Sequence, residues 1–304
     1  MNSKLIVRLS NNLGNQMFMY ASAYVFAKKL NRDFFYDDET AYQNTNLYKY
    51  NLDIFKISST KAPNNLKFLN KSGYIKRKFL KYFDNFYSSK MFYVEPRDRN
   101  KNTSFNDKIL SGNFRDKLFV EGHFESEKYF NSHINEIKSE FTFKNYKSFE
   151  NKQIFKDIKN SESVSICIRQ NRFSERKRAI TSKDDENSLI FTKDQVKYIE
   201  KSINLIKSKV TNPKFFLWSN DLKSLNNYFP DNQFTSVSTN KLDFDLFLMS
   251  QTKHSIVIPS SFNWWGAYLS KNKNKIIVRP DQKNFTNFKV NNLDFWPNNW
   301  IKIN

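Results

Sequence analysis

Cysteine, histidine and long apolar runs are what this sequence most clearly lacks. It has a single cysteine, Cys167, which excludes a disulfide within the chain and fits a reducing compartment. Its three histidines, His123, His133 and His254, show none of the spacings typical of a zinc site. No apolar run approaches the roughly 18 residues of a transmembrane helix, and the N-terminus lacks the apolar core of a signal peptide. We therefore expect a cytoplasmic protein that uses no metal and no cofactor.

Aromatic residues and positive charge are abundant. Aromatic residues make up 17% of the 304 residues and charged residues 26%, which is typical of a globular chain long enough for two domains. The formal net charge of +20 attracts polyanions such as nucleic acid, anionic lipid or a nucleotide sugar, although a lysine-biased composition would also raise it. No RNA-binding signature is present, and the aromatic residues fall in expected core helices. We therefore expect no nucleic-acid partner.

One segment combines apolar and basic residues at helical spacing. In residues 74–83, the apolar positions 75, 79, 82 and 83 share one helical face, with four basic residues beside them. Such a helix suits an anionic membrane surface, which would place the protein at the cytoplasmic face of the inner membrane. A helix packed on its own domain with a solvated basic face has the same pattern, so both interpretations stay open.

The order of the apolar runs indicates two α/β domains. A lysine-rich segment at 145–160 predicts a boundary near residue 150, and the irregular residues 41–115 form an expected insertion in the first domain. The second half alternates strands and helices, which predicts a parallel sheet with helices on both faces. Strands are expected at 164–169, 214–218, 234–237, 255–258 and 275–278, and helices at 192–207, 221–229, 243–252 and 262–269.

Three details of this pattern are specific enough to test. Thr192 and Gln195 have the spacing of a capping box, which predicts that a helix begins at Thr192. The charged residues 172–187 are expected to form a surface loop. The aromatic tail, 292–304, is too apolar to be left free and is expected to pack back onto the body.

Two stretches share the order strand, polar turn, apolar helix. They are HSIVIPSSFNWWGAYL at 254–269, with Ser260 and Ser261 at its turn, and KLIVRLSNNLGNQMFMY at 4–20, where Gly14 allows a close backbone approach. At the carboxyl end of a parallel sheet, such a turn directs N–H groups and a helix dipole at an anion. On either turn alone, an ordinary strand–helix unit is the favoured interpretation.

Together the two stretches resemble the α-1,2-fucosyltransferases of bacteria and animals (glycosyltransferase family 11), which carry GGLGNQMFQYA and SSFSWWGAWL at these places. Further segments resemble that family in the same order: FVEGHFESEKYF at 119–130, LWSND at 217–221 and DLFLMS at 245–250. The resemblance implies an α/β fold of the GT-B type, with two facing Rossmann-like domains and parallel sheets. Residues 1–150 would form the acceptor-side domain, and residues 151–304 the GDP-sugar-binding domain.

The resemblance also implies which residues hold the donor. The family's HxRRxD segment corresponds to residues 167–172, where Arg169 would grip the diphosphate and stabilise the leaving group. A strand-end salt bridge is the other interpretation of Arg169. Donor contacts are implied for Gly14, Asn15, Gln16, Ser219, Asp221, Ser260, Ser261 and Phe262, with Arg172 as a compensating cation.

The sequence departs from the family at several of these positions. Cys167, Gln170 and Arg172 stand where the family has histidine, arginine and aspartate, which indicates a divergent donor specificity or a lost activity. Asn11 and Asn12 replace two glycines of the first turn. No general base stands out among the candidates at expected strand ends, which are Asp37, Asp38, Glu121, His123 and Glu125.

Asp243 and Asp245 have the spacing of a DxD metal motif, but they open an apolar helix and are interpreted as its N-terminal acidic residues.

The function that the family resemblance implies is inverting, metal-independent transfer of L-fucose from GDP-fucose to the 2-hydroxyl of a terminal galactose. The acceptor would be a surface-glycan precursor, for example a lipid-linked one. The alternatives are a transferase of the same family with another donor or linkage, and an inactive glycan- or nucleotide-binding homologue.

Overall fold

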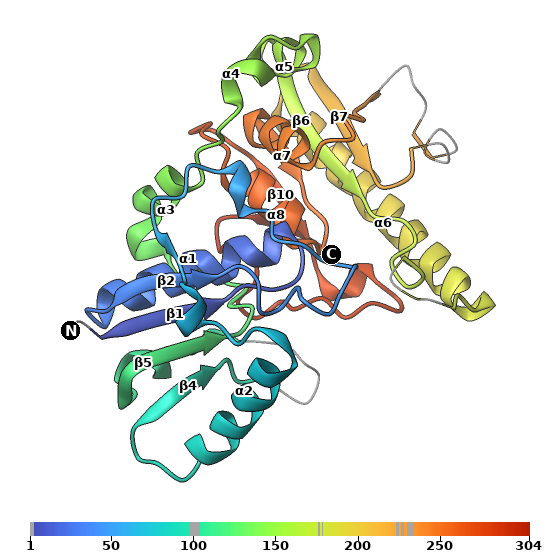
Figure 1. Ribbon diagram of the computed structural model, residues 1–304. Coiled ribbons are helices and arrows are strands. Elements are labelled where there is room, and N and C mark those ends of the chain that lie inside the picture. The colour runs from blue at the N-terminus through green and yellow to red at the C-terminus, as the bar shows by residue number, and fades with distance from the viewer. Residues whose placement is uncertain are drawn as a thin grey trace. The chain divides into compact units, whose positions relative to one another are not determined.

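The computed structural model describes residues 3–97, 104–175, 177, 179–222, 225, 228–229 and 234–304. The chain divides into two compact units (Figure 1). The first unit comprises the chain up to Lys144 together with Leu293–Phe295, and the second comprises Asn145–Asn292 and Trp296–Asn304. The division after Lys144 lies six residues before the expected boundary at 150 (150 − 144), and the tail contributes to both units.

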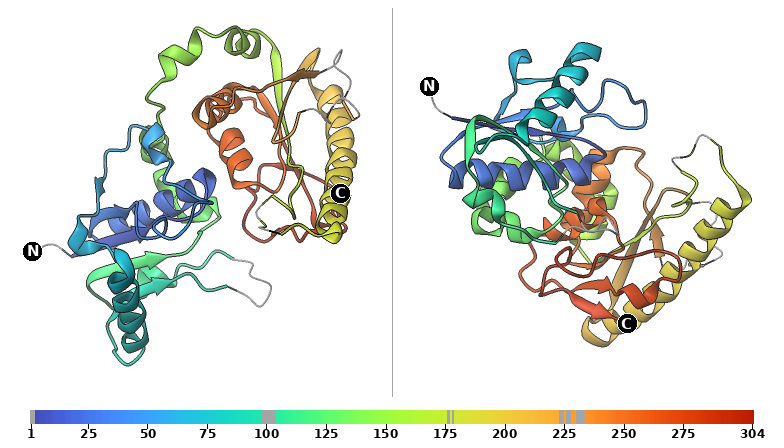
Figure 2. Two further views of the ribbon diagram at one scale, coloured as in Figure 1. Left: turned by 45° about the vertical axis from the view of Figure 1, so that its right-hand side comes forward. Right: turned by 90° about the horizontal axis from the view of Figure 1, so that it is seen from below.

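The first unit contains a five-stranded parallel sheet with the order β3-β2-β1-β5-β4. Helices α1 and α2 lie on opposite faces of this sheet (Figure 2). The elements are β1 (Lys4–Arg8), α1 (Leu13–Lys29), β2 (Asp33–Asp37), β3 (Thr60–Lys61), α2 (Asn70–Asp84), β4 (Lys90–Val94), β5 (Phe114–Glu121) and α3 (Ile134–Glu140).

The first unit is more regular than its sequence indicates. Residues 41–115, expected to be an irregular insertion, supply the edge strands β3 and β4 as well as α2. The short strands lack clear alternation, but Phe92 of β4 packs with Phe119 and Ile6 in one core cluster. Residues 126–138 do not form one continuous helix, because Glu127–Tyr129 and Asn131–His133 form short 3-10 turns before α3 begins.

The second unit contains a six-stranded parallel sheet with the order β11-β10-β9-β6-β7-β8. Helix α6 covers one face, and α7 and α8 cover the other (Figure 2). The elements are α4 (Tyr146–Glu150), α5 (Gln153–Lys159), β6 (Glu162–Ile168), α6 (Ser182–Lys209), β7 (Pro213–Ser219), β8 (Phe234–Ser236), α7 (Leu242–Gln251), β9 (His254–Ile256), α8 (Ser261–Tyr268), β10 (Ile277–Pro280) and β11 (Ile301–Ile303).

The prediction that a helix begins at Thr192 is wrong. Helix α6 begins at Ser182, ten residues earlier (192 − 182), so the second part of the expected loop 172–187 is helical. The capping box is formed by Thr181, whose hydroxyl accepts from the Asp184 N–H, and by the Asp184 carboxylate, which accepts from the Thr181 N–H. Four residues of the helix expected at 221–229 (223, 224, 226 and 227) lie outside the described residues.

The C-terminal tail is packed, as its aromatic content predicts. Strand β11 pairs with β10 at the sheet edge, and the Trp300 ring lies 5.5 Å from that of Trp264 in α8. Phe295 instead packs 6.1 Å from Phe18 of α1 in the first unit. Across the described part of the chain, none of the helices combines the length and apolar character needed to cross a bilayer.

Candidate functional site

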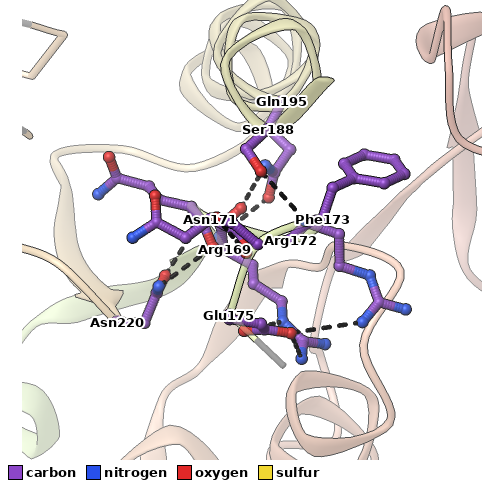
Figure 3. Close-up of polar contacts among 10 residues, drawn as sticks. Arg169, Asn171, Arg172, Phe173, Glu175, Ser188, Gln195 and Asn220 are labelled. Carbon is purple, nitrogen blue, oxygen red and sulfur yellow. Dashed lines mark hydrogen bonds and ion pairs between the residues drawn. The ribbon is translucent and has the colours of Figure 1, made fainter. Parts of the chain in front are cut away.

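Arg169 follows β6 directly, at the carboxyl end of the second unit's sheet. Its backbone is held by the side chain of Gln195 in α6, which accepts from the Arg169 N–H at 3.0 Å and donates to the Arg169 carbonyl at 2.9 Å (Figure 3). Gln195 is fully buried. The spacing of Gln195 from Thr192 predicts a helix cap, but the side chain instead makes this paired contact, which fixes the point from which the Arg169 side chain leaves the sheet.

The guanidinium of Arg169 forms an ion pair with Glu175 in the following loop. Arg169 donates from Nη2 to Glu175 Oε1 and from Nε to Oε2 at 3.3 Å. Arg172 approaches the same carboxylate, with its Nη1 3.6 Å from Oε1, and lies over the ring of Phe288 at 5.3 Å. The loop thus gathers two guanidinium groups around one anionic group (Figure 3). Glu175 had no role in the sequence analysis.

Gln170 connects the ends of β6 and β7. Its amide donates to Ser219 Oγ at 3.1 Å and to the Asp221 carbonyl. Asn220 returns two bonds to the Gln170 backbone, accepting from its N–H at 2.7 Å and donating to its carbonyl at 3.1 Å. The Ser219 hydroxyl also accepts from the Asp221 N–H at 3.2 Å. The residue that departs from the family arginine is therefore a buried cross-link between two strand ends.

Cys167 does not line this site. Its side chain is buried against α7, with Sγ 3.8 Å from the sulfur of Met249. Burial, with a smaller effect from Asp245, raises the pKa of the thiol well above its usual range. A thiol in this setting is an inert core group, so the position that carries histidine in the family serves packing here.

The second predicted anion site is the turn between β9 and α8. Ser260 is the N-cap residue of α8, Ser261 opens the helix, and these two residues and Phe262 are partly exposed. The Ser260 hydroxyl makes no capping bond to the helix. Instead, the buried Asn263 stabilises the turn by accepting from the Ile258 N–H at 2.8 Å. The turn therefore presents the helix N-terminus next to polar side chains, which is the arrangement that binds phosphates.

In the first unit, the corresponding turn precedes α1. Asn11 has a φ of 61°, a left-handed conformation that glycine and asparagine tolerate best, which explains how asparagine replaces a family glycine here. Gln16 is fully buried: its amide nitrogen donates to Asn11 and Lys49 carbonyls, and its oxygen accepts from the Asn51 N–H at 2.9 Å. These hydrogen bonds give Gln16 a structural role. Contact of Gln16 or of the buried Gly14 with the sugar nucleotide stays a prediction.

Two side chains that follow β5, His123 and Glu125, form hydrogen bonds with this turn. Asn15 donates to Glu125 Oε1 at 2.9 Å, and Asn11 Nδ2 lies 2.7 Å from His123 Nε2, which therefore accepts from the amide. Burial, together with nearby arginines, lowers the pKa of His123 to about 4, so its ring is neutral at pH 7. The segment EGHFE thus places Glu125 and His123 beside the N-terminus of α1.

The other candidate bases are committed to structure. Asp37 accepts from the N–H groups of Glu39 at 3.0 Å and Thr40 at 2.9 Å. Burial opposes the ionisation of Asp38, but hydrogen bonds from Lys61 and Lys67 outweigh it and lower its pKa. Glu121 is likewise surrounded by cations. Carboxylates stabilised in this way are weak proton acceptors.

The interpretation of Asp243 and Asp245 as helix N-terminal residues is confirmed. Both lie in the first turn of α7. Asp245 accepts from the Thr239 hydroxyl at 2.8 Å and from the Trp218 indole at 3.2 Å. In the ranges the structure describes, no group of three potential ligand residues gathers in a metal-binding arrangement.

Each unit is built on a parallel α/β sheet, and the fold is of the GT-B type. Among solved structures, the fold is similar to that of NodZ, an α-1,6-fucosyltransferase from Bradyrhizobium solved after soaking with GDP-fucose, at a TM-score of 0.55. The match covers 93% of this chain and 97% of that one at 12% identity. A NodZ crystal grown with GDP gives a TM-score of 0.52 at 13% identity, over 93% and 96% of the two chains.

Residues 1–304 match the family model described as glycosyl transferase family 11. The chain belongs to this family. It is similar to an α-1,2-colitosyltransferase of Escherichia coli, 26% identical over 309 residues and covering 99% of both chains. It is also similar to the O-antigen biosynthesis glycosyltransferase WbnK of Escherichia coli, 24% identical over 305 residues, with 90% of this chain and 92% of that one covered. The family resemblance drawn from the sequence motifs is therefore confirmed.

Proposed function

We propose that this glycosyltransferase moves L-fucose from GDP-fucose to the 2-hydroxyl of a terminal galactose in a surface-glycan precursor. The observation that carries the proposal is Arg169, which stands at the carboxyl end of β6 with its backbone fixed by Gln195. In a sheet of this type, ligands bind at the carboxyl ends of the strands, and a guanidinium there suits a diphosphate. The E. coli relative named for O-antigen biosynthesis supports a surface-glycan acceptor.

In the proposed reaction, the bond between the sugar anomeric carbon and the β-phosphate breaks as the acceptor oxygen attacks from the opposite face. Negative charge grows on the departing diphosphate, and Arg169 stabilises it with two N–H donors. The N-terminus of α8, at Ser260 and Ser261, binds a phosphate through backbone groups. Ser219 and Asp221 contact the guanosine. Positive charge from Arg169 and Arg172 takes the place of a metal ion in this scheme.

The acceptor proton needs a destination, and Glu125 is the residue we assign. It lies beside Asn15 of α1, which the family motif places at the donor. Asp38 and Glu121, by contrast, are carboxylates held ionised by neighbouring cations. A Glu125→Gln variant should therefore lose transfer to acceptor while keeping GDP affinity within about twofold of the parent.

A second donor has a specific observation in its favour. The relative that is 26% identical is named for colitose, a 3,6-dideoxy sugar that differs from fucose by one missing hydroxyl. Of the three altered positions at 167–172, Arg172 lies beside the group that pairs with Arg169, where the donor would bind. GDP-colitose is therefore the alternative donor, with the same linkage.

The test is transfer and slow hydrolysis of GDP-fucose, GDP-colitose, GDP-mannose and UDP-galactose, with a panel of galactose-terminated acceptors and a chelator present. Turnover of GDP-fucose with linkage to O2 of galactose, shown by NMR of the product, supports the proposal. Preference for GDP-colitose by tenfold or more in kcat/KM favours the alternative. Binding of GDP without turnover of any donor would instead support a binding homologue, and loss of activity with chelator would overturn metal independence.

A further inference from the structure

Helix α2 packs onto its own unit through its charged side. Arg77 and Lys81 point at the sheet and donate to Glu121 of β5, with Arg77 Nε 2.8 Å and Lys81 Nζ 2.6 Å from its oxygens. At the end of the helix, the buried Asp84 carboxylate accepts from the N–H groups of Met91 at 2.8 Å and Phe92 at 3.0 Å. The side of the helix that the fold covers is therefore largely polar, with Leu80 as the apolar side chain that packs against the core cluster.

The opposite side is apolar and faces solvent. Ile75, Phe79 and Tyr82 are 63%, 62% and 62% exposed, and Phe86, just after the helix, is 72% exposed. Their spacing of three to four residues aligns them in one stripe along the helix. A helix on the surface of a globular protein normally turns such a stripe inward, so α2 is inverted relative to the usual arrangement. The helix thus packs on its own unit, as one interpretation of the sequence expects, but its solvated face is apolar and not simply basic.

Lysines flank the stripe. Lys71, Lys76 and Lys78 are exposed, and Lys78 lies 4.7 Å from the centre of the Tyr74 ring. The one acidic residue in the sequence from 70 to 87 is Asp84, which is buried. The face thus offers apolar side chains bordered by charge of a single sign, on a chain whose net charge is +20.

A groove beside the stripe extends the apolar surface. Its volume is about 290 Å³. The lining consists of Phe79, Leu80, Phe83, Tyr87 and Met91 together with Arg115 and Asp84, whose carboxylate accepts from the Met91 and Phe92 N–H groups. The Arg115 guanidinium lies 4.1 Å from the centre of the Tyr87 ring. An apolar groove next to a guanidinium fits an acyl chain that carries an anionic head group.

We propose that the exposed face of α2, with Phe86 and the neighbouring groove, docks this protein onto an anionic lipid bilayer. Aromatic and aliphatic side chains of the stripe enter the interface between head groups and acyl chains, while the lysines contact lipid phosphates. A second copy of the chain is a poorer occupant, because pairing two such faces brings lysines against lysines without an acidic partner. The docking serves a lipid-linked acceptor if the proposed transferase function holds, but the binding itself does not depend on catalysis.

The test measures binding of the full chain to vesicles without any sugar present. Vesicles of phosphatidylcholine with 30% phosphatidylglycerol should bind the protein at least tenfold more tightly than phosphatidylcholine alone, and added salt should weaken binding. Phe79→Ser with Phe86→Ser should lower the partition coefficient by about tenfold or more, because two aromatic rings no longer leave water for the bilayer interface. Lys76→Gln with Lys78→Gln should lower it on anionic vesicles by about tenfold or more.

Matched controls come from the same unit. Leu47 is 62% exposed, and Lys108 and Lys117 are exposed. The variant Leu47→Ser therefore removes an exposed apolar side chain outside α2, and the double variant Lys108→Gln with Lys117→Gln removes two exposed charges outside α2. These controls should bind like the parent, and circular dichroism should show unchanged unfolding temperatures for all variants. Equal losses in test and control variants, or absence of binding to anionic vesicles, would overturn the proposal. So would concentration-dependent dimerisation that Phe79→Ser abolishes.

A fluorescent probe tests the orientation directly. Because the single native cysteine, Cys167, is buried, Phe86→Cys provides one accessible thiol for an environment-sensitive dye. With anionic vesicles, the dye at residue 86 should shift to the blue and be quenched by lipids that carry a quencher on the acyl chain. The same dye on Leu47→Cys should show neither change; a response only at residue 47 would contradict the assigned face.

Discussion

Glu175 forms an ion pair with Arg169, the residue that we propose holds the diphosphate of the donor. The carboxylate engages two nitrogens of the guanidinium, Nη2 and Nε, and these are the donors that a phosphate group would need. Arg172 lies 3.6 Å from the same carboxylate. Glu175 therefore occupies, within the chain, the position of the anion that the site is expected to bind, and donor binding must replace this ion pair.

The first prediction concerns the direction in which a mutation at Glu175 changes the affinity for GDP. Glu175→Gln keeps the shape of the side chain but removes the charge that competes with the diphosphate, so GDP should bind more tightly, by about three- to tenfold. Isothermal titration calorimetry with GDP measures this change. Glu186→Gln, which removes an exposed carboxylate of α6, is the control and should leave the affinity unchanged. Weaker GDP binding by Glu175→Gln would mean that Glu175 orients the arginine for the ligand.

The second prediction concerns Arg169 itself. Arg169→Ala should lower kcat by about 10²–10³ or more, because the charge that develops on the leaving diphosphate loses its partner. Arg169→Lys should recover little of this loss, since an ammonium group cannot donate two parallel hydrogen bonds. Steady-state kinetics and thermal unfolding together measure the effect. A fully active Arg169→Ala variant would remove Arg169 from the mechanism and leave it as a strand-end salt bridge.

The third prediction uses the cross-link made by Gln170. Gln170→Arg restores the family residue, but it loses the amide bonds to Ser219 and Asp221 and brings a charge into a buried position. We expect a loss of about 1–3 kcal/mol in the free energy of unfolding and weaker GDP binding. Urea unfolding and calorimetry provide the two values. A stable variant with higher activity would show that the cross-link made by Gln170 is dispensable and that an arginine at this position assists the reaction.

The sequence predicts the second unit well because its strands are buried on both faces. Runs such as Ile166–Ile168 and Phe215–Trp218 are continuous and apolar, and the motif at 260–265 marks the turn into α8. The first unit is harder to predict. Strands β3 and β4 lie at the sheet edge, are short, and are stabilised by contacts from residues distant in sequence, such as Phe119 with Phe92.

Site residues could be predicted from the sequence only where a motif indicates the backbone conformation around them. Arg169 and the serine turn could be placed because each follows a buried strand. Gln195 has only the spacing of a capping box and Glu175 belongs to no motif, because the roles of both depend on how α6 and the loop after β6 approach the strand end. The side on which α2 packs could not be predicted either. Its covered cationic residues are neutralised by Glu121, which lies 40 residues beyond Lys81 in the sequence.

The last prediction concerns the stability of this buried charge cluster at low pH. Glu121 is surrounded by Arg8, Arg77 and Lys81, which lie within 3.5 Å of its carboxylate. Burial alone would raise the pKa of the Glu121 carboxyl, but its cationic partners outweigh that effect and lower the pKa from 4.5 to about 2. Because the pKa is lower in the folded state, the unfolded chain binds the proton first as the pH falls.

The stabilisation from Glu121 should therefore be complete above about pH 4.5 and should disappear as the pH falls towards 2. Urea unfolding of the parent and of Glu121→Gln at several pH values measures it. At pH 7, the variant should lose about 3 kcal/mol, since three cations lose their shared partner, and the difference between the two proteins should shrink below pH 4. Glu162→Gln is the control, because the Glu162–Lys253 pair is half-exposed and should contribute less than about 1 kcal/mol. A difference independent of pH would mean that Glu121 acts through packing and hydrogen bonding, without a contribution from its charge.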